Sequence, residues 1–263
     1  MCKNKRMEYA IVALTVLFGA VLTFFSGFGL GTLMLPVFSL FFPLPVAVGA
    51  TAVVHLSNNI FKFGIVYRHI HLSTLLRFGI PALVFAILGS LLLDVVGHLE
   101  SFYSYSIGEK TFQLTPLKIV IGSLMIFFAW FDLDPRFSGW SMDRKWIPLG
   151  GVLSGFFGGI SGHQGAFRAA FLNKAGLTKE QFIGTSNSIA LIIDISRILV
   201  YVQTLDFMAL ADEKFLLITG VFCAFIGTYF GKELLKKTTM KGIQRLVGAL
   251  LLIMGALFVS GIL

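Results

Sequence analysis

Eight long apolar runs are the feature that most limits how this chain of 263 residues can fold. Most of them come close to the roughly 20 residues that an α-helix needs to cross the hydrocarbon core of a bilayer. Only 13% of the residues are charged and the mean hydropathy is +0.87, far from the balance of a globular domain with a water-exposed surface. The runs do not alternate as the strands of a membrane barrel do, so we predict an all-α integral membrane protein. They cover residues 8–41, 45–67, 73–97, 114–131, 146–173, 178–204, 211–235 and 242–263.

Positive charge is concentrated in the loops beside these runs. The formal net charge is +8, and clusters such as Lys236, Lys237 and Lys241 have no aromatic residues interleaved with them. This pattern is typical of membrane topology signals and does not favour a nucleic-acid partner. Cys2 and Cys223 lie far apart, so we expect no disulfide framework, no metal and no other cofactor. The expected location is the plasma membrane, as a multi-pass protein of a bacterial inner membrane surrounded by lipid, with the oligomeric state left open.

The sequence also repeats itself. GAVLTFFSGFGLG, at residues 19–31, aligns with GGVLSGFFGGISG, at residues 150–162, with an offset of 131. Farther along the offset becomes 135, and Lys62 then aligns with Arg197. We therefore predict two related four-segment halves within one transmembrane domain. The first half covers residues 1–135 and the second covers residues 136–263.

Glycines cluster at corresponding places in the first and fifth runs. Glycine in a helix interior costs up to about 1 kcal/mol relative to alanine, so dense clusters predict a break in the helix. Paired interruptions at matching positions of two halves are typical of the binding site of a transporter. The predicted helix-break glycines are Gly27, Gly29 and Gly31 in the first run and Gly158, Gly159, Gly162 and Gly165 in the fifth.

The loop charges bear on whether these broken segments cross the membrane. If all eight runs cross, the basic loop residues divide equally between the two sides, which is unusual for a membrane protein. If the first and fifth runs turn back at their glycines, twice as many basic residues lie on one side as on the other, and the two halves become inverted repeats. We favour the inverted arrangement, with eight simple crossings as the alternative.

Three cations lie inside apolar runs, where each costs on the order of 2.5 to 3.5 kcal/mol at the bilayer centre. Arg197 could pair with Asp194 three residues earlier, and Lys62 could extend to the membrane interface. An intramembrane binding site for a small anionic substrate is the functional alternative. The candidate substrate-binding residues are His55, Asn59, Lys62, Ser161, His163, Gln164, Arg168 and Arg197.

The stretch GGISGHQGAFR, at residues 158–168, carries the strongest signal for such a site. If the helix breaks within it, the second half-helix exposes unpaired N–H groups and the positive end of its dipole. Arg168 then lies about one turn into that half-helix, and its planar guanidinium suits an oxyanion.

Asp194 is a candidate for proton coupling. It lies well inside an apolar run, three residues before Arg197. If a bound anion engages Arg197, Asp194 loses part of its counter-charge, and substrate and proton would bind together. A permanent Asp194–Arg197 pair that only stabilises the bundle is the alternative.

Four stretches carry a pattern shared with a known family: GAVLTFFSGFGLGTLMLPVFSL, AVGATAVV, GGVLSGFFGGISGHQGAFRAAFL and FIGTSNSIALIIDISRILVY. Together they resemble the TauE/SafE sulfite exporter family of membrane transporters, and the resemblance covers nearly the whole chain. It implies a secondary transporter, an exporter of a small sulfur-containing anion such as sulfite, a sulfonate or thiosulfate, and no enzymatic activity. The second copy departs from the family pattern, because SGHQGAFR stands where a glycine-rich run followed by proline is usual.

Two other functions fit parts of the sequence. A passive anion channel is compatible with the same buried cations. GISG also resembles the GxSG motif of rhomboid intramembrane proteases, with Ser161 as the nucleophile. That mechanism needs a histidine facing Ser161, and His163, two residues away, is expected to point elsewhere on a regular helix.

Overall fold

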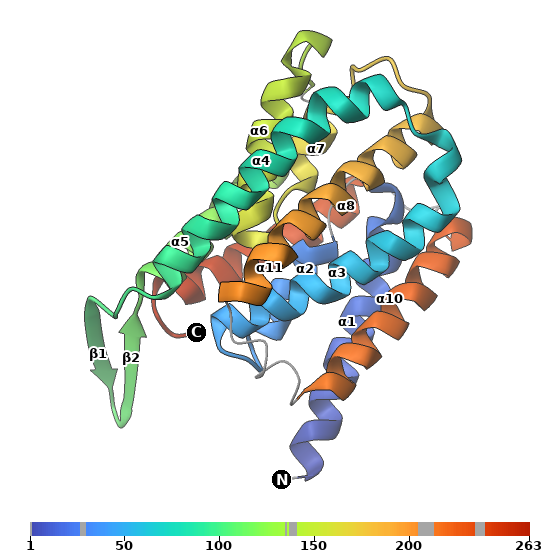
Figure 1. Ribbon diagram of the computed structural model, residues 1–263. Helices are drawn as coiled ribbons and strands as arrows, with labels where there is room; N and C mark the ends of the chain where they lie inside the picture. Colours follow the sequence, from blue (N-terminus) through green and yellow to red (C-terminus); the bar gives the residue numbers. More distant parts are fainter. Residues whose placement is uncertain (1, 27–29, 135, 137–140, 205–212, 235–239) are drawn as a thin grey trace.

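The computed structural model describes residues 2–26, 30–134, 136, 141–204, 213–234 and 240–263 (Figure 1). Its regular structure is almost entirely α-helical, which confirms the predicted all-α class. The helices are α1 (Cys2–Ser26), α2 (Leu30–Phe38), α3 (Leu44–Val66), α4 (Leu72–Gly97), α5 (Pro116–Leu133), α6 (Ile147–Ser161), α7 (Gly165–Leu172), α8 (Lys179–Thr204), α10 (Lys214–Leu234) and α11 (Met240–Val259).

Four stretches are long and apolar enough to cross a membrane by length and composition. They are Leu44–His69, Leu72–Gly97, Lys179–Thr204 and Lys214–Gly231, and three shorter apolar helical stretches accompany them. The chain is therefore a multi-pass membrane protein. The eight segments, the two related halves and their inversion stay predictions.

Local sequence signals set several helix starts. Thr115 caps α5, because its side chain accepts a hydrogen bond from the backbone N–H of Lys118, and Pro116 supplies the first helical residue. His71 caps α4 in the same way, accepting from the backbone N–H of Thr74. These caps satisfy backbone donors that a helix start leaves open.

A β-hairpin between α4 and α5 is a difference from the sequence prediction. Strands β1 (Tyr103–Ile107) and β2 (Lys110–Leu114) pair antiparallel and project away from the helices (Figure 1). Gly108 begins the two-residue turn with φ +61, the positive φ that such turns require. The predicted run that began at residue 114 therefore follows a strand, and the polar, alternating YSYSI stretch is the signal for it.

Glycines let several helices pack backbone to backbone. A Cβ atom added at Gly155 on α6 would lie only 2.3 Å from the carbonyl oxygen of Ala82 on α4. The same is true between α10 and α1, where a Cβ at Gly227 would lie 2.3 Å from the carbonyl oxygen of Leu17. Small residues permit this close approach in membranes, where packing drives helix association.

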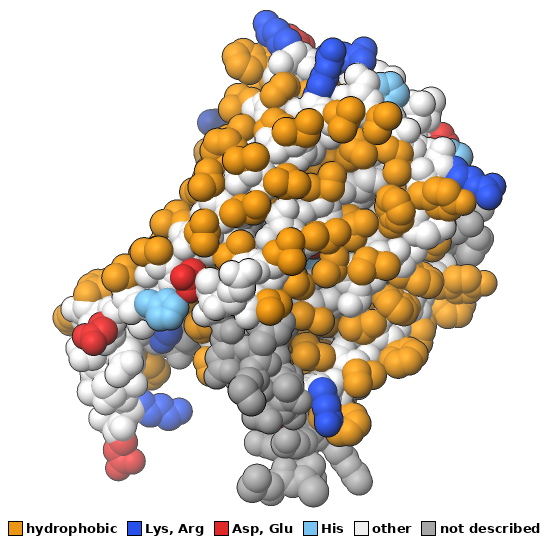
Figure 2. All heavy atoms as spheres, viewed as in Figure 1, with side chains coloured by type: hydrophobic (Ala, Val, Ile, Leu, Met, Phe, Trp, Pro, Cys, Tyr) orange, Lys and Arg blue, Asp and Glu red, His pale blue; other side chains and the backbone are white. Residues whose placement is uncertain are grey.

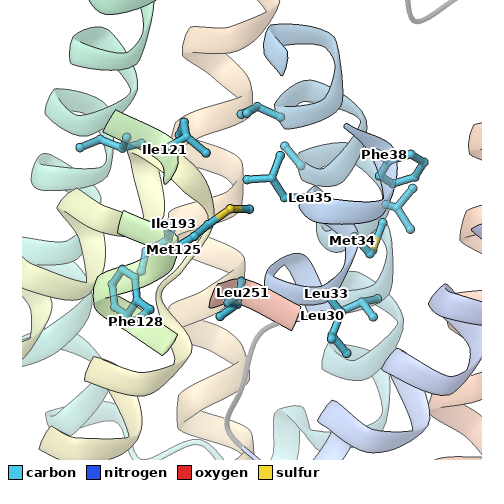
Figure 3. Packing of buried hydrophobic residues seen from close by; sticks show 14 of the residues in the cluster. Leu30, Leu33, Met34, Leu35, Phe38, Ile121, Met125, Phe128, Ile193 and Leu251 are labelled. Carbon is cyan, nitrogen blue, oxygen red and sulfur yellow. The ribbon is translucent and has the colours of Figure 1, made fainter. Parts of the chain in front are cut away.

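The hydrophobic core gathers side chains from helices far apart in the sequence. Figure 3 shows Leu35 from α2, Met125 from α5, Ile193 from α8 and Leu251 from α11, all of which are buried. Because α2 has only 9 residues and nearly all are buried, it lies inside the bundle and not on its surface.

The outer surface is apolar over a wide area. Figure 2 shows hydrophobic side chains across the face in view, with lysines and arginines mainly at its borders. Phe215, Phe222, Leu199 and Ile80 are each more than 60% exposed. Such a surface suits contact with lipid tails and the basic borders suit the headgroups.

Candidate functional site

A buried polar cluster lies where α3, α8, α7 and the segment between α6 and α7 meet. All eight candidate binding residues and Asp194 are buried, each with 8% exposure or less. Helix α8 contributes Asp194 and Arg197, and α3 contributes His55, Asn59 and Lys62 at one helical face. The helical spacing seen in the sequence thus brings residues from both predicted halves together.

Asp194 is the centre of this cluster. Its Oδ2 atom lies 2.6 Å from His55 Nδ1 and accepts a hydrogen bond from Asn59 Nδ2 at 2.6 Å. Its Oδ1 atom lies 2.9 Å from Arg197 Nη2 and accepts a long hydrogen bond from Gln164 Nε2 at 3.4 Å. Both carboxylate oxygens are therefore satisfied by groups from three segments.

The ion pair that the Asp194–Arg197 spacing allowed is present, but it does not satisfy the guanidinium. Arg197 is 0% exposed, and none of its three side-chain nitrogens has a well-aligned hydrogen bond. Its Nη2 atom lies at ion-pair distance from Asp194, while Nε and Nη1 have no hydrogen-bond partner. A buried guanidinium with free N–H groups carries a high desolvation cost, which an oxyanion ligand would offset.

Arg168 is connected to Asp194 through Gln164. Its Nε donates to Ser186 Oγ at 2.7 Å, and its Nη1 donates to Gln164 Oε1 at 3.0 Å. Because Gln164 donates in turn to Asp194, both arginines belong to one hydrogen-bonded network.

Lys62 belongs to the same cluster. It is 8% exposed and within electrostatic range of Arg168 and Asp194. Its burial argues against the alternative in which the ammonium extends to the membrane interface.

The predicted helix-break glycines occupy several different positions. Gly158 and Gly159 lie inside α6, Gly162 caps its C-terminus in a left-handed conformation with φ +78, and Gly165 begins α7. Gly31 is the second residue of α2. Gly27 and Gly29 lie outside the described residues.

Gly162 allows a prediction. A Cβ atom there would lie 2.6 Å from Arg197 Nη1, and an L-residue would also be strained at this φ. Gly162→Ala should therefore lose about 1–2 kcal/mol to the left-handed backbone and also displace the guanidinium. We expect a lower unfolding temperature and weaker stabilisation by anions in thermal-shift measurements.

Gly176 supplies the matched control. Its φ is +76, but a Cβ atom there would meet nothing within 4 Å. Gly176→Ala should show the backbone cost alone and keep its response to anions. Equal anion responses in the two variants would contradict a role for the Gly162–Arg197 contact.

Ser161 and His163 are closer than the sequence predicted, so that expectation was wrong. His163 Nδ1 lies 3.0 Å from Ser161 Oγ, because the left-handed cap at Gly162 interrupts the regular helix between them. The Ser161 hydroxyl donates to the carbonyl oxygen of Phe157 at 3.1 Å, and with its proton in that direction His163 Nδ1 is the donor to Ser161 Oγ. In that arrangement the histidine does not take up the serine proton, which a serine nucleophile requires.

Three residues of the cluster are not among the candidates that the sequence indicates. Ser186 binds Arg168, Asn187 Nδ2 donates to the carbonyl oxygen of Asn59 at 3.1 Å, and the Tyr201 hydroxyl donates to the carbonyl oxygen of Gly159. Ser186 and Tyr201 could have been found, since residues 186, 190, 194, 197 and 201 follow one face of α8.

Metal ligation finds no support in the part of the chain that the structure describes. No group of three or more histidine, cysteine, aspartate or glutamate side chains could hold a metal ion there. Apart from Asp194, the cluster offers cationic and neutral hydrogen-bond donors, which recognise oxyanions.

Comparison with known proteins identifies the family. No curated protein and no solved structure matches the chain. The family model described as Sulfite exporter TauE/SafE matches residues 11–258, nearly the full length. This multi-pass membrane protein therefore belongs to the TauE/SafE family of transporters.

Proposed function

We propose that the protein is a secondary transporter that exports a small sulfur-containing anion, such as sulfite, a sulfonate or thiosulfate, across the plasma membrane of a bacterium. The observation that carries this proposal is the fully buried Arg197, whose Nε and Nη1 atoms lack hydrogen-bond partners beside two further buried cations. Membership of the TauE/SafE family supports the transport function and the choice of substrate class.

The donors around Arg197 suit an oxyanion. His163 Nε2 is also buried without a hydrogen-bond partner, and α7 begins at Gly165, two residues farther along the chain. The N-terminal end of α7 adds backbone N–H groups and a partial positive charge. We assign substrate binding to this region, with Arg168 and Gln164 linking it to Asp194.

Asp194 would couple transport to protons. An anion at Arg197 competes with the carboxylate for the same guanidinium, so occupancy weakens the ion pair at Oδ1. Protonation of the Asp194–His55 pair would then accompany substrate binding, since the two ligands stabilise the same state. The glycine-bearing segments of two inverted halves would supply the alternating access.

The first test of this function is the response of Arg168→Gln to anions. Glutamine removes the charge and the fork that reaches Ser186 and Gln164. In a thermal-shift panel with sulfite, thiosulfate and methanesulfonate, we expect this variant to fold but to lose the anion-dependent rise in unfolding temperature.

Arg136→Gln is the control, because the Arg136 side chain is 88% exposed and lies outside the cluster. It should respond to anions as the parent does. Anion stabilisation of Arg168→Gln equal to the parent's would rule Arg168 out of the site. Saturable flux with counterflow in reconstituted vesicles distinguishes a carrier from a passive channel.

The inverted arrangement has its own test. If the first and fifth segments turn back, cysteines placed near Phe42 and near Lys174 should be labelled from opposite sides of the membrane. Eight simple crossings place both loops on one side, so labelling from the same side would refute the inversion.

A further inference from the structure

Three cations and one carboxylate share the buried cluster. Arg197 and Asp194 are 0% exposed, Arg168 is 4% exposed and Lys62 is 8% exposed. Asp194 is the only buried carboxylate among the residues that the structure describes. With Lys62 as an ammonium, the cluster carries two more positive than negative charges. Protonation of His55 or His163 would only increase this excess.

These charges are close enough to act on one ligand. Arg168 bonds Gln164, Gln164 bonds Asp194, and Asp194 pairs with Arg197, so the two guanidinium groups flank one carboxylate network. Lys62 is on the α3 face that also carries Asn59, one of the direct partners of Asp194. A ligand at Arg197 therefore experiences the field of all three cations.

The charge of the ligand decides how well it balances this excess. Charges interact strongly in a membrane interior, because the medium there screens them poorly. At an excess of two charges, a monoanion leaves one positive charge uncompensated and a dianion leaves none. A proton taken up with the substrate raises each remainder by one, so the dianion still balances the cluster better. A dianion would also hold Lys62 in its ammonium form, since an opposite charge favours the ionised state of a neighbour.

We propose that this site selects its substrate by charge and binds dianionic oxyanions in preference to monoanions of the same shape. This inference rests on the proposed transport of an anion. The selection comes from the net charge of Lys62, Arg168, Arg197 and Asp194 together. It requires no contact between the protein and the rest of the ligand.

Methylphosphonate and methanesulfonate are the probes that isolate charge. Both have a methyl group on a tetrahedral XO₃ head, but at alkaline pH the first carries two negative charges and the second carries one. Titration calorimetry on the purified full-length protein should give a dissociation constant at least about tenfold lower for methylphosphonate, equivalent to about 1.4 kcal/mol. Sulfate should likewise bind with a lower dissociation constant than methanesulfonate.

Substitution at Lys62 tests the origin of the preference. Lys62→Met removes one positive charge and should reduce the ratio of the two dissociation constants to within about threefold of unity, while methanesulfonate still binds. Lys62→Arg keeps the charge and should keep the preference. If Lys62→Met does not fold, the ratio of the two dissociation constants measured for the parent still tests charge selection.

The outcomes separate the two proposals. Equal affinity of the parent for the two probes would overturn charge selection and leave the anion site standing. A preference for methylphosphonate that persists in Lys62→Met would also overturn it, since the excess charge would then not be its source. If methylphosphonate, methanesulfonate and sulfite all fail to bind, the anion site itself is overturned.

Discussion

Gly155→Ala is expected to destabilise the protein by about 1–3 kcal/mol, the usual cost of forcing extra volume into a packed interior. The new Cβ atom would lie 2.3 Å from the carbonyl oxygen of Ala82 and 2.7 Å from its Cα atom. Both are backbone atoms of α4, so no side chain can move aside and the two helices must separate. Thermal unfolding in detergent measures the effect as a lower midpoint temperature.

Gly64→Ala is the matched control for this substitution. Gly64 also lies inside a helix, α3, but a Cβ atom there would meet nothing within 4 Å. Since alanine favours a helix interior over glycine by up to about 1 kcal/mol, this variant should be as stable as the parent or more so. If both variants unfold at the temperature of the parent, the close packing of α4 and α6 is not what stabilises this interface.

The helical class follows from local properties of the sequence, which explains why it was predictable. An apolar run of about 20 residues has one stable form in a bilayer, since a helix satisfies its own backbone. The cationic cluster was predictable for a related reason. A charge inside such a run is costly wherever it lies, so Lys62, Arg168 and Arg197 stand out from the sequence alone.

Contacts between segments were harder to predict. Gly155 and Gly159 allow α6 to pack closely against α4, and nothing in the sequence of α6 identifies α4 as its partner. The Ser161–His163 contact depends on one left-handed residue, Gly162, which the expectation of a regular helix did not include. The glycine density in residues 158–165 therefore combines close packing against α4 with the end of a helix.

Asp194→Asn should lower the stability of the protein more than Gly155→Ala does, and it should also change transport. Asparagine keeps the size of the side chain but removes the only buried negative charge in the described chain, beside three buried cations. It also places an amide N–H₂ where Asn59 or Gln164 now donates. Breaking a buried ion pair in this way costs about 3–5 kcal/mol, so the midpoint of thermal unfolding should fall well below that of the parent.

The same variant should depend on anions more than the parent does. With Asp194 neutral, sulfate or methylphosphonate would be the only negative charge available to the cluster, and either should restore much of the lost stability. Asp94→Asn is the control, because Asp94 lies near the end of α4, its side chain is 24% exposed, and its ionic contact is an exposed His98. Anions should not rescue that variant.

Transport completes the test of Asp194. If proton uptake at this carboxylate accompanies anion binding, flux through Asp194→Asn should lose the pH dependence that the parent shows between pH 5 and pH 8, whereas Asp94→Asn should keep it. Anion-stabilised Asp194→Asn protein can be reconstituted, so a loss of fold need not obscure the comparison. A pH profile identical to the parent's in that folded protein would remove Asp194 from the coupling mechanism and leave it as the counter-charge that makes three buried cations tolerable.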